Sequence, residues 1–159
     1  MSEIKSSYKI LKEHNLIVEY HSGRLDVDSL IDFKKRIALD PLFTPNLNYF
    51  IHSKNVTFTS IDEAENDISI FSKFINTNFK VYGNNMRVAI ITNTPSQVVQ
   101  ATRFKMMQEN ANHCVDIFSR YENAMKWLGI IDLEIEKLIE VLLDLKKLKE
   151  YHASKKTPF

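Results

Sequence analysis

Hydrophobic and polar positions along the chain alternate between short strand-like runs and longer helical stripes. Two apolar runs, Tyr8–Leu11 and Leu16–Tyr20, flank a polar turn, which is the pattern of a β-hairpin. Strand-like runs at Leu47–Ile51, Met86–Ile91 and Cys114–Phe118 then alternate with stripes of helical period. This order predicts an α/β fold: a mixed sheet of about five strands, built from an N-terminal hairpin and alternating strands and helices, with the helices packed on the sheet.

Polar residues that favour helix starts precede each helix of this alternating part. Ser60 with Glu63, and Thr94 with Gln97, match the capping box, in which each side chain satisfies a free backbone N–H group of the other residue. The first helix carries Lys34 as the one polar residue on its apolar stripe. The predicted N-terminal caps are Asp26, Ser60, Thr94 and Ser119.

An extra C-terminal helix is predicted over Asp132–Glu150, and residues 151–159 have the composition of a flexible basic tail. The apolar residues of this helix repeat with the spacing of a heptad seam. The helix either folds back over its own sheet, or forms a dimer seam or a partner-binding surface. Because other helices are available to cover the sheet, we favour a homodimer. The predicted seam consists of Ile131, Ile135, Leu138, Leu142 and Leu145.

The composition narrows the classes of function. The 159 residues carry a net charge of +1, so no overall field attracts nucleic acid, which we do not expect as a partner. With 3 glycines and 1 cysteine, the chain offers no glycine-rich phosphate loop, no intrachain disulfide and no multi-cysteine metal site. We therefore predict neither a metal nor a cofactor. No signal peptide or membrane-spanning run stands out, so we expect a cytoplasmic protein without stable membrane insertion.

Four short motifs follow one another along the first three quarters of the chain. The hairpin closes on GRLDVD at residues 23–28, and the first helix leads into DPLF at residues 40–43. The strand RVAII follows at residues 87–91, and a closing strand runs into a helix with Glu122, Ala124, Trp127 and Leu128. Together these motifs resemble the SpoIIAA-like branch of STAS domains, also described as STAS/SEC14-like. The resemblance implies one such domain over residues 1–129, followed by the amphipathic helix at residues 130–150.

The resemblance implies a non-catalytic regulatory or protein-interaction module in bacterial signalling, which acts through the loop after the third strand. In anti-sigma-factor antagonists of this class, that loop presents a serine for phosphorylation, and Ser53 lies near its position. The chain lacks their D-S-x-G signature, and many SpoIIAA-like relatives have an aspartate in place of His52. The alternative, which we favour for Ser53, is a loop serine that satisfies backbone groups. The candidate phospho or partner loop consists of His52, Ser53, Lys54 and Thr57.

Two further functions are weighed against this module. SEC14-like relatives imply a protein that binds or senses a small apolar or anionic ligand in a cleft. The helix start after Thr94 favours anions, although ordinary surface cations are the better interpretation of the basic residues nearby. Cys114 and the adjacent His113 would point to opposite faces of a strand, so they do not form a catalytic pair. The sequence shows no convergent nucleophile, base and orienting group, so we do not predict an enzyme and assign no catalytic residue. The possible anion contacts are Arg87, Thr94 and Arg103.

Overall fold

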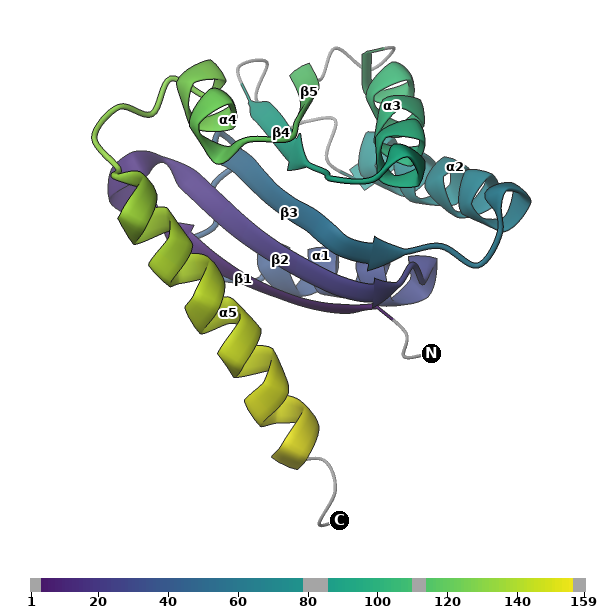
Figure 1. The fold of residues 1–159 in the computed structure, drawn as a ribbon, viewed down its shortest axis with the longest axis horizontal. Coiled ribbons are helices and arrows are strands. Elements are labelled where there is room, and N and C mark those ends of the chain that lie inside the picture. Colours follow the sequence, from purple (N-terminus) through teal and green to yellow (C-terminus); the bar gives the residue numbers. More distant parts are fainter. Residues whose placement is uncertain (1–3, 79–85, 110–113, 156–159) are drawn as a thin grey trace.

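The computed structural model describes residues 4–78, 86–109 and 114–155, which form a five-stranded mixed sheet with helices on both faces (Figure 1). The strands follow one another across the sheet in sequence order. The first two are antiparallel and the other neighbours are parallel, which confirms the predicted fold class. The strands are β1 (Lys5–Leu11), β2 (Leu16–Arg24), β3 (Asn48–Thr57), β4 (Arg87–Ile91) and β5 (Cys114–Phe118).

The α-helices form two layers around the sheet. They are α1 (Val27–Ala38), α2 (Ile61–Asn78), α3 (Pro95–Glu109), α4 (Tyr121–Trp127) and α5 (Ile135–Lys155). Helices α1, α2 and α3 all pack on one face, as expected when successive parallel connections share one handedness. The helices after the last strand, α4 and α5, cover the opposite face.

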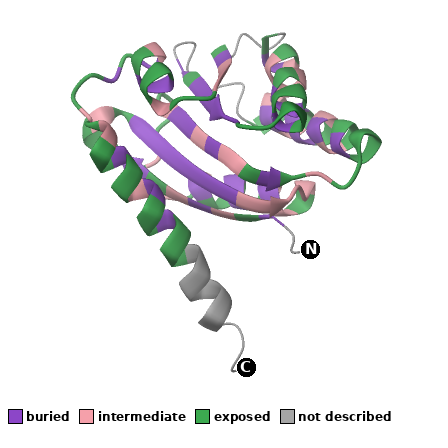
Figure 2. Ribbon diagram, in the orientation of Figure 1, coloured by how far each residue is buried: buried purple, intermediate pink, exposed green. Residues whose placement is uncertain are grey.

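The sheet is buried from both sides, and β2 shows how the sequence achieves this (Figure 2). Leu16, Val18 and Tyr20 face α4 and α5, whereas Ile17 faces the layer of α1 to α3. Side chains alternate between the two faces of a strand, so a strand covered on both faces needs a nearly continuous apolar run. Glu19 interrupts this run and is buried, so it needs polar partners inside the protein.

The cap predicted at Ser60 for α2 and the full capping box predicted for α3 are confirmed. The backbone N–H of Glu63 donates to Ser60 Oγ over 3.1 Å. The backbone N–H of Gln97 donates to Thr94 Oγ1, and the backbone N–H of Thr94 donates to Gln97 Oε1. These local signals fix where both helices begin, at the carboxyl ends of β3 and β4.

The other two predicted caps are wrong in detail. Asp26 does precede α1, but its carboxylate accepts a hydrogen bond from the Ser29 hydroxyl and forms no side-chain cap with the helix backbone. Helix α4 begins after Arg120, one residue later than a cap at Ser119 requires, and also lacks a side-chain cap. Tertiary packing therefore holds these two helix starts.

The predicted dimer seam is an intrachain contact instead. Leu138, Leu142 and Leu145 are buried against β1 and β2, and the Ser7 hydroxyl donates to the backbone carbonyl of Leu145 over 3.1 Å. The apolar residues of both strands on this face need such a cover. An apolar stripe of this spacing can line a sheet as well as a second helix, and here it lines the sheet.

Both ends of α5 also differ from the prediction. The helix begins at Ile135, which packs partly against the core, while Ile131 precedes the helix and is 94% exposed. It continues to Lys155, so residues 151–155 are helical and do not form a tail. Residues 156–159 of the predicted tail lie outside the described residues.

Candidate functional site

The predicted site loop is part of a strand. β3 continues to Thr57 because β2 continues to Arg24 and pairs with it over this length. Ser53 lies on the side of α1 to α3, where it lines a cavity, whereas His52 and Lys54 lie near α4 on the opposite face. The prediction that His52, Ser53, Lys54 and Thr57 form a loop is therefore wrong, because all four residues lie within β3.

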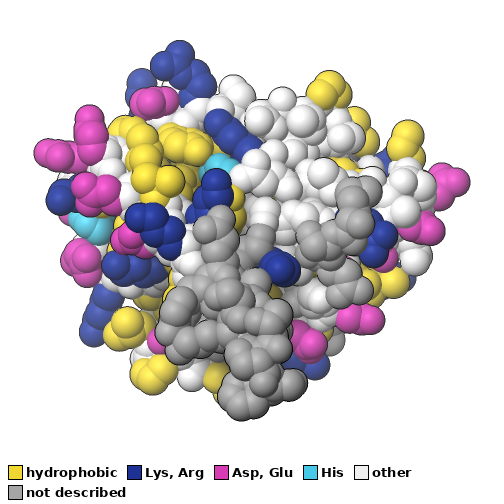
Figure 3. Space-filling model, turned by 60° about the horizontal axis from the view of Figure 1, so that its bottom comes forward, with side chains coloured by type: hydrophobic (Ala, Val, Ile, Leu, Met, Phe, Trp, Pro, Cys, Tyr) yellow, Lys and Arg dark blue, Asp and Glu magenta, His cyan; other side chains and the backbone are white. Residues whose placement is uncertain are grey.

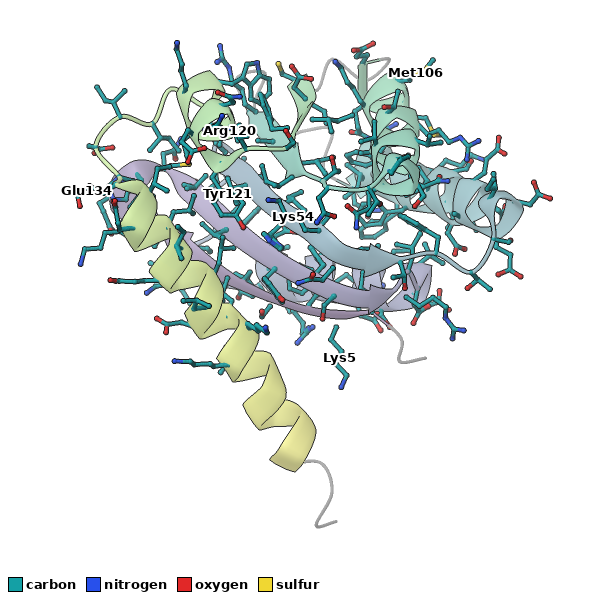
Figure 4. The ribbon with its side chains drawn as sticks, in the orientation of Figure 1. Lys5, Lys54, Met106, Arg120, Tyr121 and Glu134 are labelled. Atoms are coloured by element: carbon teal, nitrogen blue, oxygen red, sulfur yellow. The ribbon has the colours of Figure 1, made fainter. Side chains whose placement is uncertain are left out.

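His52 and Lys54 belong to an aromatic cluster between the sheet and α4. The His52 ring stacks on Tyr20 with 5.1 Å between ring centroids, and His52 Nε2 lies 3.1 Å from the Tyr121 hydroxyl oxygen. Lys54 Nζ lies 4.7 Å from the centroid of the Tyr121 ring, and both side chains lie in front of the sheet (Figure 4). Asn55 Nδ2 donates to the Tyr20 hydroxyl over 2.8 Å. The cluster ties α4 to β2 and β3.

The surroundings of His52 favour its neutral form. Burial, and then the positive charge of Lys54, lowers the pKa of His52 from 6.5 to about 4. Burial likewise raises the pKa of Tyr121. The unfolded chain therefore binds a proton at His52 near pH 6.5, which the folded protein accepts only near pH 4.

This difference predicts that the folded protein becomes less stable as the pH is lowered. The contribution of His52 is fully present above pH 6.5 and is lost as the pH falls toward 4, by up to about 3 kcal/mol. Urea unfolding of the wild type and of His52→Gln, from about pH 7 to about pH 4, measures the effect. His52→Gln should flatten the dependence of the free energy of unfolding on pH. Tyr121→Phe should leave this dependence unchanged, because burial is the main cause of the lowered pKa of His52. Equal slopes in the wild type and His52→Gln would contradict this assignment.

A cavity of about 150 Å³ lies between the sheet and the layer of α1, α2 and α3. Its wall is mostly apolar, which together with a few polar groups is the usual form of a small-molecule site. The polar residues of the wall include Glu19, His21, Lys34, Ser53, Thr92 and Gln97.

A buried ionic network forms part of this wall. Glu19 is 0% exposed and Lys34 is 7% exposed, and Lys34 Nζ pairs with one carboxylate oxygen of Glu19. The other carboxylate oxygen lies 2.8 Å from His21 Nε2, and the Ser6 hydroxyl lies 2.6 Å from His21 Nδ1. Lys34 Nζ also lies 4.7 Å from the centroid of the Tyr49 ring. Three elements, β1, β2 and α1, thus contribute to one polar cluster.

The network keeps Glu19 ionised inside the protein. Burial by itself would raise the pKa of Glu19, but the charge of Lys34 and the hydrogen bond from His21 outweigh it and lower the pKa to about 2. Sequence reasoning missed Glu19 as a site residue. The available signal was one charged residue on each of two buried elements, Glu19 within an apolar strand and Lys34 on an apolar helical stripe, because buried opposite charges need each other.

The three possible anion contacts do not converge. Arg87 begins β4, donates to the backbone carbonyl of Trp127 over 2.5 Å and lies over the Trp127 ring. Thr94 lies beyond the other end of β4, where it caps α3. Arg103 pairs with Glu65, with 3.7 Å between nitrogen and oxygen. The predicted grouping is wrong because Arg87 and Thr94 lie at opposite ends of one strand.

Helix α3 departs from the usual amphipathic pattern, because its inner side carries glutamines beside Ala101 and Phe104. Its inner side buries Gln97 and Gln100, and Gln97 Nε2 donates to the backbone carbonyl of Val56 over 3.0 Å. The side of α3 that faces away from the sheet exposes apolar side chains. One of them is Met106, which lies at the surface of the molecule (Figure 4). A helix packed on a sheet ordinarily turns its apolar side chains inward. We call the exposed residues the α3 surface, which consists of Val98, Val99, Thr102 and Met106.

Other candidate chemistry finds little support. Within the described part of the chain, no three His, Cys, Asp or Glu side chains are grouped to hold a metal ion, and no helix combines the length and apolar character of a membrane span. Cys114 is exposed at the start of β5 and not packed inside, and His113 lies outside the described residues. One face of the surface gathers hydrophobic side chains beside Lys and Arg side chains (Figure 3).

Comparison with known proteins shows the fold. No family model and no curated protein matches the sequence. An uncharacterised protein of the DUF3478 family with a SpoIIAA-like fold, from Shewanella loihica, is similar at 19% identity and a TM-score of 0.49. An anti-sigma factor antagonist from Mycobacterium paratuberculosis is similar at 12% identity and a TM-score of 0.52. Each comparison covers 79% of this chain and 94% of the other. The resemblance predicted from the motifs is thus confirmed as a shared fold.

Proposed function

We propose that this protein is a non-catalytic regulatory module that binds a partner protein through the α3 surface and the adjoining connection after β3. The exposed apolar side of α3 is the observation that carries the proposal. Val98, Val99 and Met106 are 42%, 47% and 62% exposed, although the chain has a sheet on which such side chains could be buried. Apolar side chains gathered on a surface mark interaction sites more often than single exposed ones do.

The connection after β3 lies next to the start of α3. Gln97 joins the two, because its Nε2 donates to the backbone carbonyls of Lys54 and Val56 over 2.9 and 3.0 Å. Ile61, the first residue of α2, is 68% exposed at this same end of the sheet. The fold shared with an anti-sigma factor antagonist supports a regulatory role by analogy alone.

Substitutions on the α3 surface should abolish partner binding and leave the fold intact. Affinity capture from the native cells would compare the wild type, Val98→Lys/Met106→Glu, and the control Leu39→Glu, whose leucine is 84% exposed at the end of α1. We expect one protein to be retained by the wild type and the control but lost by the double variant, and the purified pair to form a 1:1 complex. Capture that does not depend on the α3 surface would contradict the proposal.

A second candidate function is the binding or sensing of a small molecule. The cavity of about 150 Å³ and its buried ionic network favour it specifically. Replacing a buried ion pair with apolar residues is often neutral or stabilising, so stability alone does not explain why such a pair lines a cavity. The two functions use different parts of the molecule, the inner and outer sides of α3, and can be tested separately.

A further inference from the structure

We propose that the cavity binds a small, uncharged, mainly apolar molecule that carries one carbonyl or hydroxyl oxygen, to which Lys34 Nζ donates a hydrogen bond. The proposal rests on the small-molecule function given above as the second candidate, and names the class of ligand. It is independent of partner binding at the α3 surface.

The size and lining of the cavity determine how large and how apolar the ligand is. Apolar cavities of about 150 Å³ accept molecules of the size of benzene. Helices α2 and α3 line this one with Phe71, Ala101 and Phe104, and β4 adds Val88 and Ile90. A single ring or a short branched chain therefore fits, whereas a nucleotide or a peptide is too large and too polar.

The ammonium group of Lys34 has donors available for a ligand. It carries three N–H groups. Among the described residues, Glu19 accepts a hydrogen bond from Nζ, and the Tyr49 ring covers another side with 4.7 Å between Nζ and the ring centroid. Lys34 also lines the cavity, whose wall is otherwise largely apolar. A ligand oxygen would give a remaining N–H group the partner that apolar side chains cannot supply.

Charge balance selects a neutral ligand. Lys34 and His21 are the basic residues among the described lining residues, and both already contact Glu19. A carboxylate in the cavity would place a second negative charge near Glu19 without an uncommitted cation. Burying an uncompensated charge is far more costly than burying a carbonyl group that accepts one hydrogen bond. The anionic ligand considered from the sequence is therefore disfavoured in this cavity.

Three probes of similar shape test the proposal on the full chain. Acetophenone has an apolar ring and a carbonyl oxygen, isopropylbenzene has the same branching without an acceptor, and benzoate adds a negative charge. NMR titrations of backbone amide shifts would give the affinities and locate the site. We expect acetophenone to bind at least roughly tenfold more tightly than isopropylbenzene, because it gains a hydrogen bond to a charged donor, and benzoate to bind most weakly.

Two variants assign the effect to the cavity. Ala101→Phe should fill the space and remove binding of every probe. Glu19→Leu/Lys34→Met should bind acetophenone and isopropylbenzene equally; if this variant does not fold, the ranking of probes on the wild type still decides. Equal affinity of those two probes for the wild type would overturn the role of Lys34 and retain a small-molecule site. Tighter binding of benzoate than of acetophenone would overturn the assignment of an uncharged ligand. Absence of binding by all three probes would overturn the second candidate function as well.

Discussion

Replacing Lys34 with methionine is expected to lower the free energy of unfolding by about 3–5 kcal/mol, which is the usual effect of removing one partner of a buried ion pair. The substitution leaves the Glu19 carboxylate 0% exposed and without its main counter-charge. Urea unfolding at neutral pH measures the loss. Lys35→Met changes the exposed neighbour on α1 and should shift stability by no more than about 0.5 kcal/mol.

The double variant Glu19→Leu/Lys34→Met separates the charge from the packing. With both charges removed, no uncompensated ion remains, and stability should return to within about 1–2 kcal/mol of the wild type or exceed it. A Lys34→Met variant as stable as the wild type would contradict the buried pair. A double variant less stable than Lys34→Met would show that packing, and not charge, sets the loss at this site.

A chain that ends at Gly129 is expected not to fold. It lacks Leu138, Leu142 and Leu145, which are 0%, 5% and 4% exposed, and it uncovers the apolar residues of β1 and β2 beneath them. Burial of three leucines contributes about 5–9 kcal/mol, comparable with the whole stability of a typical domain at roughly 5–15 kcal/mol. Circular dichroism and light scattering should show an unfolded or aggregated chain.

Single substitutions on the two sides of α5 give the matched control. Leu138→Ala should cost about 2–5 kcal/mol, because it leaves a hole in the core. Leu143→Ala, at a position that is 51% exposed, should change stability by no more than about 0.5 kcal/mol. A folded, monomeric chain ending at Gly129, derived from a dimeric full chain, would instead restore the seam predicted from the sequence.

Signals carried by neighbouring residues were enough to predict the order of elements and the caps at the starts of α2 and α3. Ser60 and Thr94 need only the backbone of the next turn to act as caps, so local sequence determines them. The end of β3 was missed because His52, Ser53 and Lys54 look like a loop until β2 is known to extend beside them. A strand end depends on its partner, which a local pattern does not contain.

The candidate site was harder to predict because its parts meet only in the fold. Glu19 and Lys34 are far apart in sequence and show their role only when β2 and α1 bury both. The apolar seam of α5 was interpreted as favouring a homodimer, although such a seam suits a sheet and a second helix equally well. Arg87 and Thr94 were considered together as possible anion contacts, although β4 separates them. The inner side of α3 was also hard to predict, because the buried Gln97 and Gln100 interrupt the apolar stripe that ordinarily marks this side of a helix.

Site-specific photo-crosslinking tests the proposed interaction most directly. A photoreactive amino acid would replace Val99 on the α3 surface, and Leu39 on α1 would serve as the exposed control position, in cells that naturally express the protein. We predict one discrete crosslinked product of higher mass at position 99 and none at position 39. No crosslink at position 99, or the same products at both positions, would contradict a partner-binding α3 surface.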